Sequence, residues 1–373
     1  MKETQVLIIG GGLAGLTTAI HLSQNNLRVI LIERNEYPHH KVCGEYISME
    51  VLPYLNSLNI DLTKLNGPEI HTFEYSTMAG EVIRASLEMG GLGLSRYRLD
   101  SFLFEQARGS CEILQDTVTE SVFRNGSFIT KCLSGTEYKS EFVLGAFGKR
   151  SNLDKFLNRN FFQSSSGWLG VKAHYRHKNF PDDLVALHNF EGGYCGLSKT
   201  ETGNINACYL SNYKTFKKYK NTREFKEKVL FKNPHLKEFF LGADLLFEKE
   251  ISIAQVSFDQ KNRVEAHILM LGDAAGLIHP LCGNGMAIAI HSAKIVSENI
   301  IKYYGTKNYS RAMLEADYIY AWKIQFNSRM KNGRILQRIL LNESLNSISQ
   351  KLIKAMPDIL PWIIKKTHGN YIC

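Results

Sequence analysis

The run VLIIGGGLAGLTTAIHL at residues 6–22 constrains the fold more than any other part of the chain. Gly10, Gly12 and Gly15 follow G-x-G-x-x-G spacing between a short apolar stretch and a helical pattern. In a βαβ unit the first glycine allows a tight turn, the second lets the backbone approach a diphosphate, and the third lets helix and strand pack closely. The sequence therefore predicts a parallel βαβ unit whose helix N-terminus faces the phosphates of a dinucleotide.

An acidic residue follows at the spacing that a dinucleotide site needs. Glu33 closes the expected second strand, 29–32, and comes 23 residues after Gly10. A carboxylate there can accept hydrogen bonds from both ribose hydroxyls of an adenosine, whereas the alternative is an exposed side chain at a strand end. The next residue, Arg34, either stacks on the adenine or faces solvent. We expect Glu33 to bind the adenosine half of the cofactor.

A second constellation lies far from the first, in HILMLGDAAGLIHPLCGNGMAIAIHSA at residues 267–293. Asp273 follows an apolar strand, where its carboxylate can bind a polyol chain such as ribityl. The turn at 280–286 opens a helix whose first N–H groups would face a flavin ring and stabilise negative charge there on reduction. An ordinary strand-turn-helix with a capping Asp explains Asp273 alone but not the whole run. The two constellations together favour a flavin dinucleotide over NAD.

The chain resembles a known family, the FAD-dependent oxidoreductases and monooxygenases built like para-hydroxybenzoate hydroxylase, and is nearest the geranylgeranyl reductase branch. The resemblance rests on GGGLAG at 10–15, ERN at 33–35, KVCGE at 41–45, SRYRLDSFLFEQA at 95–107 and GDAAGLIHPLCGNGM at 272–286. It implies FAD as cofactor, with NADH or NADPH as electron donor. Carried over residue by residue, it implies FAD contacts at Gly10, Gly12, Leu13, Ala14, Gly15, Glu33, Arg34, Cys43, Gly44, Arg96, Val118, Asp273, Gly285 and Met286.

Three family motifs are altered or absent. Many of the monooxygenases carry a D-G motif whose Asp helps the nicotinamide cofactor to dock, and here Phe147 stands at that position in LGAFGKRSNLD. The prenyl reductases carry Y-x-W-x-F-P along the substrate cavity, but in residues 192–210 only Tyr194 of that element remains. The W-x-W-x-I-P signature of the flavin-dependent halogenases is absent from the sequence. These departures argue against halogenation and leave the electron donor open.

Two residues are catalytic candidates. Cys43 lies in KVCGE, where its thiol could act as an acid or contact substrate; a packing role is the alternative. His279 precedes the turn at Pro280 and could donate to substrate or flavin, whereas a lone His near a helix start is more often structural. Hydroxylation in this family needs no protein nucleophile, because the flavin carries the oxygen transfer.

The hydrophobic pattern predicts an α/β fold with interleaved domains. Four stretches with strand-like patterns, 168–175, 183–190, 204–210 and 251–258, favour a mostly antiparallel sheet. We expect a doubly wound FAD-binding domain formed by 1–70, 95–165 and 255–300, an interleaved substrate domain formed by 71–94 and 166–254, and a helical C-terminal region at 301–373.

Cysteine usage and charge exclude several classes. The seven cysteines show no CxxC spacing, which favours reduced thiols over disulfides and predicts no metal site. The net charge is +9, but the residues after 300 hold 12 Lys/Arg and only 4 Asp/Glu, so the excess belongs to the tail and no nucleic-acid partner is expected. Without an apolar run of ~18 residues or a signal peptide, we predict a cytoplasmic protein.

The tail from 330 to 356 combines apolar and basic residues, and it either packs on the protein or makes peripheral contact with an anionic membrane. Its apolar members are Ile335, Ile339, Leu345, Ile348, Leu352 and Met356, and its basic members are Arg334, Arg338, Lys351 and Lys354.

Three functions follow as hypotheses. The first is an FAD-dependent monooxygenase that hydroxylates a lipophilic, aromatic or polyketide small molecule, and the missing Y-x-W-x-F-P element favours it. The second is a reductase of lipid double bonds like the geranylgeranyl reductases. The third is a flavin-binding carrier of an apolar ligand without turnover. The sequence leaves the substrate and the oligomeric state open.

Overall fold

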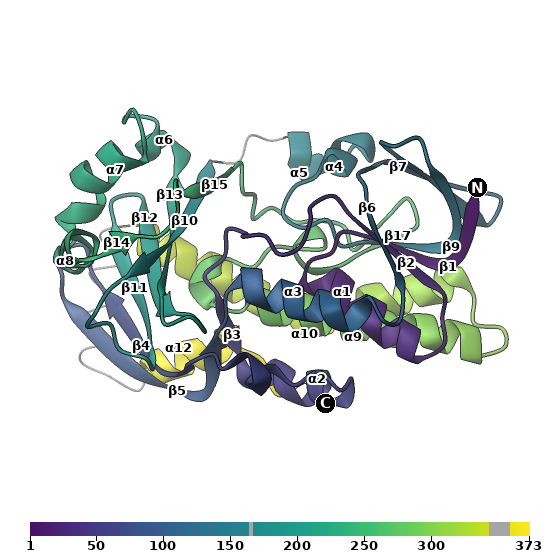
Figure 1. The fold of residues 1–373 in the computed structure, drawn as a ribbon, viewed down its shortest axis with the longest axis horizontal. Coiled ribbons are helices and arrows are strands. Elements are labelled where there is room, and N and C mark those ends of the chain that lie inside the picture. Colours follow the sequence, from purple (N-terminus) through teal and green to yellow (C-terminus); the bar gives the residue numbers. More distant parts are fainter. Residues whose placement is uncertain (164–166, 343–358) are drawn as a thin grey trace.

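A computed structural model of the chain describes residues 1–163, 167–342 and 359–373. Two sheets lie side by side along the long axis of the molecule, one in each half (Figure 1). The helices α9 (Gly285–Gly305) and α10 (Arg311–Leu341) pack against each other below the first sheet in the view of Figure 1. The N-terminus lies at the far end of the first half.

The first sheet has a parallel centre made from both ends of the chain. Its order is β16-β17-β9-β1-β2-β6, and a hairpin of β7 and β8 extends from β9. Val, Ile and Leu fill β1 and β2 and are buried, which is what a parallel sheet covered on both faces requires. The strands are β1 (Lys2–Ile9), β2 (Val29–Glu33), β6 (Glu112–Gln115), β7 (Val118–Arg124), β8 (Ser127–Cys132), β9 (Glu137–Gly145), β16 (Val264–Glu265) and β17 (Ile268–Met270).

Helices cover this sheet. The helix α1 (Leu13–Gln24) contacts both α3 (Arg96–Ala107) and α9, so segments about 80 and 270 residues apart meet around the glycine turn. Shorter helices are α2 (Leu52–Ser57), α4 (Asn152–Phe156) and α5 (Asn160–Gln163). The α/β class that the sequence predicts is confirmed.

The second sheet is mostly antiparallel. Its order is β14-β10-β13-β12-β11-β4-β5-β3, with β15 beside β10, and the pair β4–β11 is parallel. The helices α6 (Tyr213–Phe216), α7 (Thr222–Lys228) and α8 (Pro234–Gly242) lie on its outer side (Figure 1). The strands are β3 (Tyr46–Ser48), β4 (Glu69–Ser76), β5 (Val82–Gly93), β10 (Trp168–Arg176), β11 (Leu184–Phe190), β12 (Gly193–Lys199), β13 (Ile205–Asn212), β14 (Asp244–Leu245) and β15 (Ile251–Ala254).

Several details differ from the sequence-based expectations. The strand expected at 251–258 ends at Ala254 because Gln255 adopts a left-handed conformation with φ 56°. Likewise β17 starts at Ile268 because His267 has φ 67°. The strand β12 was not expected, and β3 comes from residues assigned to the first domain but pairs with β5 in the second sheet.

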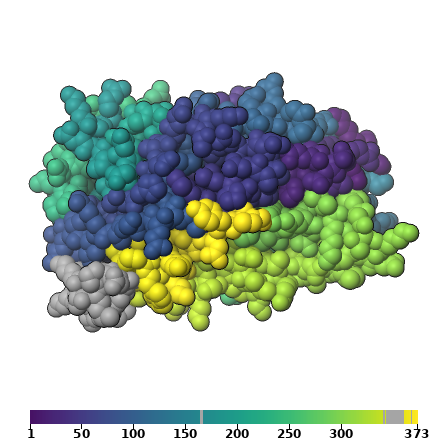
Figure 2. Space-filling model, turned by 90° about the horizontal axis from the view of Figure 1, so that it is seen from below, coloured from purple at the N-terminus to yellow at the C-terminus, as the bar shows by residue number. Residues whose placement is uncertain are grey.

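The C-terminal residues are held by hydrogen bonds to Glu50, near the start of the sequence, whose side chain is fully buried. Its carboxylate accepts hydrogen bonds from Arg329 Nη1 at 3.1 Å and from the Gly369 backbone N–H at 2.6 Å. The backbone N–H of Ile372 donates to the Glu50 carbonyl. Figure 2 shows the C-terminal residues in yellow lying between α10 and the earlier parts of the chain.

The helical tail is confirmed where the structure describes it, in α10 and in α12 (Ile359–Thr367). The expected amphipathic residues Leu345, Ile348, Lys351, Leu352, Lys354 and Met356 lie outside the described residues. Within the described part of the chain, every helix is too short or too polar to cross a membrane.

Candidate functional site

The glycine turn between β1 and α1 has the local geometry that its spacing predicts. Gly10 has φ 107°, and a Cβ on it would lie 2.5 Å from the carbonyl oxygen of Ala146. Only glycine fits there. Gly12 is different: a Cβ on it would find Arg96 Nη2 at 3.6 Å and Lys41 Nζ at 3.9 Å as its nearest atoms. The backbone at Gly12 therefore faces two cations.

These cations share a single carboxylate. Asp100 is fully buried; its oxygens accept from Arg96 Nε at 2.7 Å, Arg96 Nη2 at 2.8 Å and Lys41 Nζ at 2.8 Å. Burial would raise the pKa of Asp100, but Arg96 and Lys41 outweigh burial and hold the pKa below its ordinary value. Arg96 and Lys41 carry two positive charges and Asp100 carries one negative charge, so the group has a net charge of +1. The N-terminus of α1 beside them has no side-chain cap. This arrangement fits a diphosphate.

Glu33 lies directly under the glycine turn. The backbone N–H of Gly11 donates to Glu33 Oε2 at 2.7 Å, and the backbone N–H of Asn35 donates to Oε1 at 3.0 Å. Only 8% of Glu33 is exposed, which excludes the alternative of an exposed strand-end residue. Arg34 is exposed. Glu33 therefore fixes the turn, and its contact with a ribose stays a prediction.

Val118, the other residue expected near the adenosine, is buried at the start of β7. Two residues before it, the backbone N–H of Asp116 donates to the Glu33 carbonyl at 3.0 Å. The structure therefore brings Val118 into the neighbourhood of Glu33, although they are 85 residues apart.

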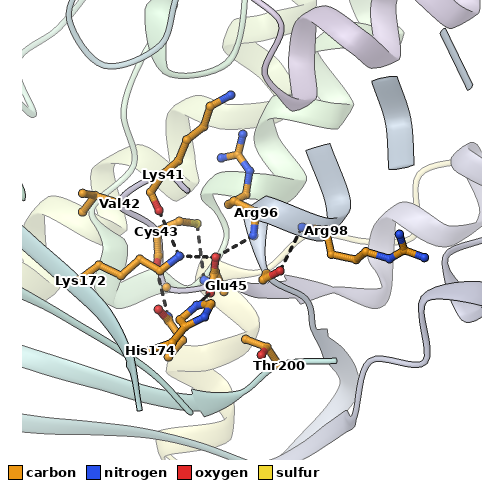
Figure 3. Close-up of polar contacts among 12 residues, drawn as sticks. Lys41, Val42, Cys43, Glu45, Arg96, Arg98, Lys172, His174 and Thr200 are labelled. Carbon is orange, nitrogen blue, oxygen red and sulfur yellow. Dashed lines mark hydrogen bonds and ion pairs between the residues drawn. The ribbon is translucent and has the colours of Figure 1, made fainter. Parts of the chain in front are cut away.

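A buried ion pair fixes the segment 41–45, which carries the KVCGE motif. Glu45 and Lys172 are both fully buried, and Lys172 Nζ donates to Glu45 Oε1. The other oxygen, Oε2, lies 2.7 Å from His174 Nε2, and the backbone N–H of Arg96 donates to Oε1 at 2.7 Å. Figure 3 shows these groups converging on Glu45, with the side chains of Lys41 and Arg96 extending away from it.

The carboxylate of Glu45 is ionised at neutral pH. Burial would raise its pKa, but the charge of Lys172 and the hydrogen bond from His174 outweigh burial and lower it. His40, Glu45 and His174 also bring one potential metal-ligand atom each within 4.8 Å of one another. Lys172 already neutralises this carboxylate, and its ammonium would repel a divalent cation. We therefore interpret the cluster as an ion-pair network.

Further hydrogen bonds hold the segment 41–45 against the second sheet. Asn206 Nδ2 donates to the Cys43 carbonyl at 3.1 Å, and Ser198 Oγ donates to the Gly44 carbonyl at 3.3 Å. The thiol of Cys43 is half-buried and accepts from the Glu45 backbone N–H at 3.5 Å. Cys43 thus lies on a segment that is held by the second sheet on one side and by α3 and Lys149 on the other.

Lys149 connects the segment 41–45 to Asp273, in the second motif identified from the sequence. Its Nζ donates to the Val42 carbonyl at 3.1 Å and lies 3.6 Å from Asp273 Oδ2. Asp273 sits in a short turn, Gly272–Ala274, and α9 starts at Gly285 with Met286 buried behind it. The structure therefore places the glycine turn, the segment 41–45 and the Asp273 turn along one continuous site, with polar groups at both ends.

His279 lies in an aromatic cluster. Its ring centroid is 4.6 Å from that of Phe258, 5.9 Å from that of Tyr194 and 6.0 Å from that of Trp168. Only 3% of the residue is exposed, and burial lowers its pKa to about 3. The imidazole is neutral near pH 7, so it holds no imidazolium proton to donate. These contacts favour the structural alternative for His279.

The second sheet presents one face to the segment 41–45. On β10 this face carries Gly170, where a Cβ would lie 3.1 Å from Val42 Cγ1, together with Lys172 and His174. Tyr194 and Leu210, which pair across β12 and β13, belong to an apolar cluster with Trp168. The face thus changes from polar near Glu45 to aromatic and aliphatic near Trp168.

The sequence analysis missed Lys41, Glu45, Lys149, Lys172 and His174. A usable signal was present in β10, because WLGVKAHYR is an apolar strand with Lys172 and His174 at alternate positions. Alternate residues of a strand share a face, and a charge on a buried face needs a partner. The partner itself, 127 residues away, leaves no local trace.

Comparison with known proteins finds a matching family and similar relatives over most of the chain. Residues 3–314 match the family described as FAD binding domain. A digeranylgeranylglycerophospholipid reductase of Methanosphaera stadtmanae is 24% identical over 347 residues, which cover 88% of this chain and 82% of the relative.

Solved structures share the fold. A geranylgeranyl bacteriochlorophyll reductase-like protein of Thermoplasma acidophilum superposes with a TM-score of 0.76 at 19% identity, covering 94% of this chain and 90% of that one. A flavin-dependent brominase gives a TM-score of 0.76 at 16% identity, covering 100% and 95%.

Proposed function

The chain belongs to the FAD binding domain family and is an FAD-dependent oxidoreductase, and on this premise we propose that it reduces carbon–carbon double bonds in an apolar, prenyl-type substrate. One structural observation carries the proposal. The Cys43 thiol lies on a segment that hydrogen bonds tie to Asn206 of the second sheet, to Arg96 of α3 and to Lys149 in the loop after β9. Saturation of a double bond by hydride transfer also requires a proton at the second carbon, which a positioned side chain can supply.

The residues described above have separate roles in this reaction. When bound and reduced, FAD would supply the hydride-transfer chemistry. Cys43 would give a proton to the carbon of the double bond that does not receive the hydride, so that two hydrogens are added in all. Gly12, Arg96 and Lys41 would hold the cofactor's diphosphate, and Asp273 would orient its ribityl chain. The aromatic end of the second sheet near Trp168 binds hydrocarbon, which is worth about 25 cal/mol per Å2 buried.

The name of the Methanosphaera stadtmanae relative also supports reduction over hydroxylation, although the sequence analysis favoured hydroxylation. Hydroxylation remains the second candidate, because the Y-x-W-x-F-P element is missing and only Tyr194 of it is present. A flavin-binding carrier without turnover is the third, supported by Phe147 in place of the docking Asp. Peripheral membrane contact through the basic C-terminal region stays a proposal, and so does the apolar substrate.

Anaerobic single-turnover assays test the proposed reaction. With chemically reduced protein and geranylgeranyl diphosphate, we expect reoxidation of the flavin and a product heavier by two hydrogens. Cys43→Ala should slow this step by about 10²–10⁴-fold without loss of FAD, because a general acid contributes that much. Cys373→Ala, at an exposed position, is the matched control and should be unaffected. Oxygen-dependent incorporation of one oxygen atom into the substrate would instead establish hydroxylation.

The electron donor is addressed by Phe147, which is half-buried and follows β9. If its ring replaces a docking carboxylate, flavin reduction by NADH or NADPH is expected to be slow, and Phe147→Asp should accelerate it. Stopped-flow measurement of flavin bleaching gives both rates. Fast reduction in the unmodified protein would contradict this prediction.

A further inference from the structure

A cavity of about 170 Å3 lies between the turn after Asp273 and the helix α10, and we call it the cationic pocket. The charged and polar side chains around it are Asp259, Gln260, Lys261, Arg263, Asn327, Lys331 and Arg334. Four of these carry a positive charge and one carries a negative charge. A cavity needs only about 10–15 Å3 to hold one water molecule, so this one has room for a multi-atom ligand.

Among the described residues that line the cationic pocket, the positive charges outnumber the negative ones. Lys261 is 3% exposed, and its Nζ donates to two backbone carbonyls, those of Lys149 at 2.9 Å and Asp273 at 2.8 Å. The guanidinium of Arg263 lies over the Trp322 ring, 4.3 Å from its centroid. Within the described residues, Arg334 has neither an ion pair nor a hydrogen bond and is only half-exposed. Among the described residues, the side chains that line the pocket therefore carry more positive than negative charge, although Asp273 and Asp154 also act on Lys261.

The pKa values of two of the cations are lowered, as expected where positive charges are buried close together. Burial lowers the pKa of Lys261 to about 8. Burial also lowers the pKa of Arg263, and the positive charges of Arg159 and Arg334 lower it further, outweighing Tyr318. An unscreened group of cations costs free energy in the folded protein, and a bound anion would recover it. The pair Glu45–Lys172 differs, because there each buried charge has its counter-charge.

The location connects the cationic pocket to the proposed site. Gly276 lines the pocket, and a Cβ on it would lie 2.9 Å from the Trp322 ring. Lys261 lines the same pocket while its ammonium binds the carbonyl of Asp273. Lys261 also donates to the carbonyl of Lys149, whose own ammonium contacts the segment 41–45 through the Val42 carbonyl. A ligand anchored in the pocket by an anionic group lies next to the cofactor-binding turn.

We propose that the cationic pocket binds the phosphate or diphosphate group of an organic ligand other than FAD. Arginine forks match phosphate oxygens with paired hydrogen bonds, and two arginines with two lysines favour a multiply charged anion over a carboxylate. The group belongs to either a nicotinamide nucleotide or a prenyl diphosphate. The proposal deepens the proposed function, but binding can be measured without turnover, so that each can fail separately.

Calorimetric titration of the FAD-loaded full chain with inorganic diphosphate tests the proposal, because bound FAD already fills its own diphosphate site. We expect saturable binding at one site. Arg334→Gln should weaken binding about tenfold or more, since it removes a charged hydrogen bond. Lys323→Gln is the matched control: it removes one charge from an exposed position on the same helix and should leave the affinity unchanged. The flavin spectrum and melting temperature verify that both variants are folded.

Two outcomes of the titration would overturn the proposal: no saturable binding by the unmodified protein, or equal weakening in Arg334→Gln and Lys323→Gln. The competition experiment below adds a third. Competition then identifies the ligand. Displacement of diphosphate by NADPH assigns the pocket to the electron donor, and displacement by geranylgeranyl diphosphate assigns it to the substrate. Displacement by neither would refute an organic phosphate ligand. None of these readouts depends on double-bond reduction, so a failed turnover assay leaves the binding result intact.

Discussion

Replacing Lys172 with methionine is expected to destabilise the protein by about 3–5 kcal/mol, because it leaves the buried carboxylate of Glu45 without its ammonium partner. Both residues are fully buried, so water cannot replace the lost charge. The segment 41–45 should loosen with it, and FAD affinity should fall because Lys41 lies on that segment. Urea unfolding followed by circular dichroism measures the first effect, and flavin fluorescence measures the second.

Two further variants define the cause. Arg176→Met removes a positive charge from an exposed position at the end of the same strand and should change stability by less than about 0.5 kcal/mol. The double variant Glu45→Gln with Lys172→Met removes both charges and should recover part of the loss, since the uncompensated charge is then gone. A Lys172→Met protein as stable as the unmodified one would show that the ion pair is not the anchor of the segment.

Gly12→Asp should weaken FAD binding strongly while the protein stays folded. A Cβ at this position has no neighbour closer than 3.6 Å, and φ −86° suits any residue. Asp is also a preferred residue at a helix N-cap, which is the place of Gly12 in α1. Its carboxylate would pair with Arg96 or Lys41 and repel a diphosphate. Like charges in contact cost several kcal/mol, so the affinity should fall by a factor of about 100 or more.

Gly109→Asp is the control for this experiment. It introduces the same side chain at an exposed glycine whose Cβ would meet no atom within 4 Å. Equilibrium dialysis with FAD should give an unchanged dissociation constant for Gly109→Asp. If Gly12→Asp also retained FAD at its original affinity, the diphosphate would have to lie elsewhere, and the assignment of Arg96 and Lys41 would be wrong.

The parts of the fold and site that sequence predicted well are those set by neighbours in the chain. The left-handed conformation of Gly10 and the position of Glu33 at the end of β2 follow from a turn and a strand that are contiguous, and periodic apolar residues are enough to identify β1, α1 and β10. Two expected strands are shorter in the structure, because Gln255 ends β15 and His267 precedes β17 in the left-handed backbone conformation. These conformations depend on tertiary packing and not on residue type.

The rest of the site depends on contacts between distant segments. Glu45 meets Lys172 across 127 residues, and Lys149 meets Val42 across 107. Neither contact produces a periodic pattern or a recognisable spacing. His279 shows the opposite problem: its position before a turn suggested chemistry, whereas the rings of Trp168, Tyr194 and Phe258, which come from three separate segments, enclose it.

The strand order of the first sheet also bears on how the chain folds during synthesis. The strand β9 has β1 on one side, and on its other side β8 pairs with residues 137–140, but the C-terminal end of that side, Leu144 and Gly145, is covered only when β17 arrives, more than 120 residues later. Until Ile268–Met270 has left the ribosome, part of β9 is an open strand edge that can pair with another chain. Long-range pairing of this kind slows folding and prolongs the exposure of such edges. A nascent chain stalled between the second sheet and β17 would therefore be the species most exposed to aggregation and most in need of a chaperone.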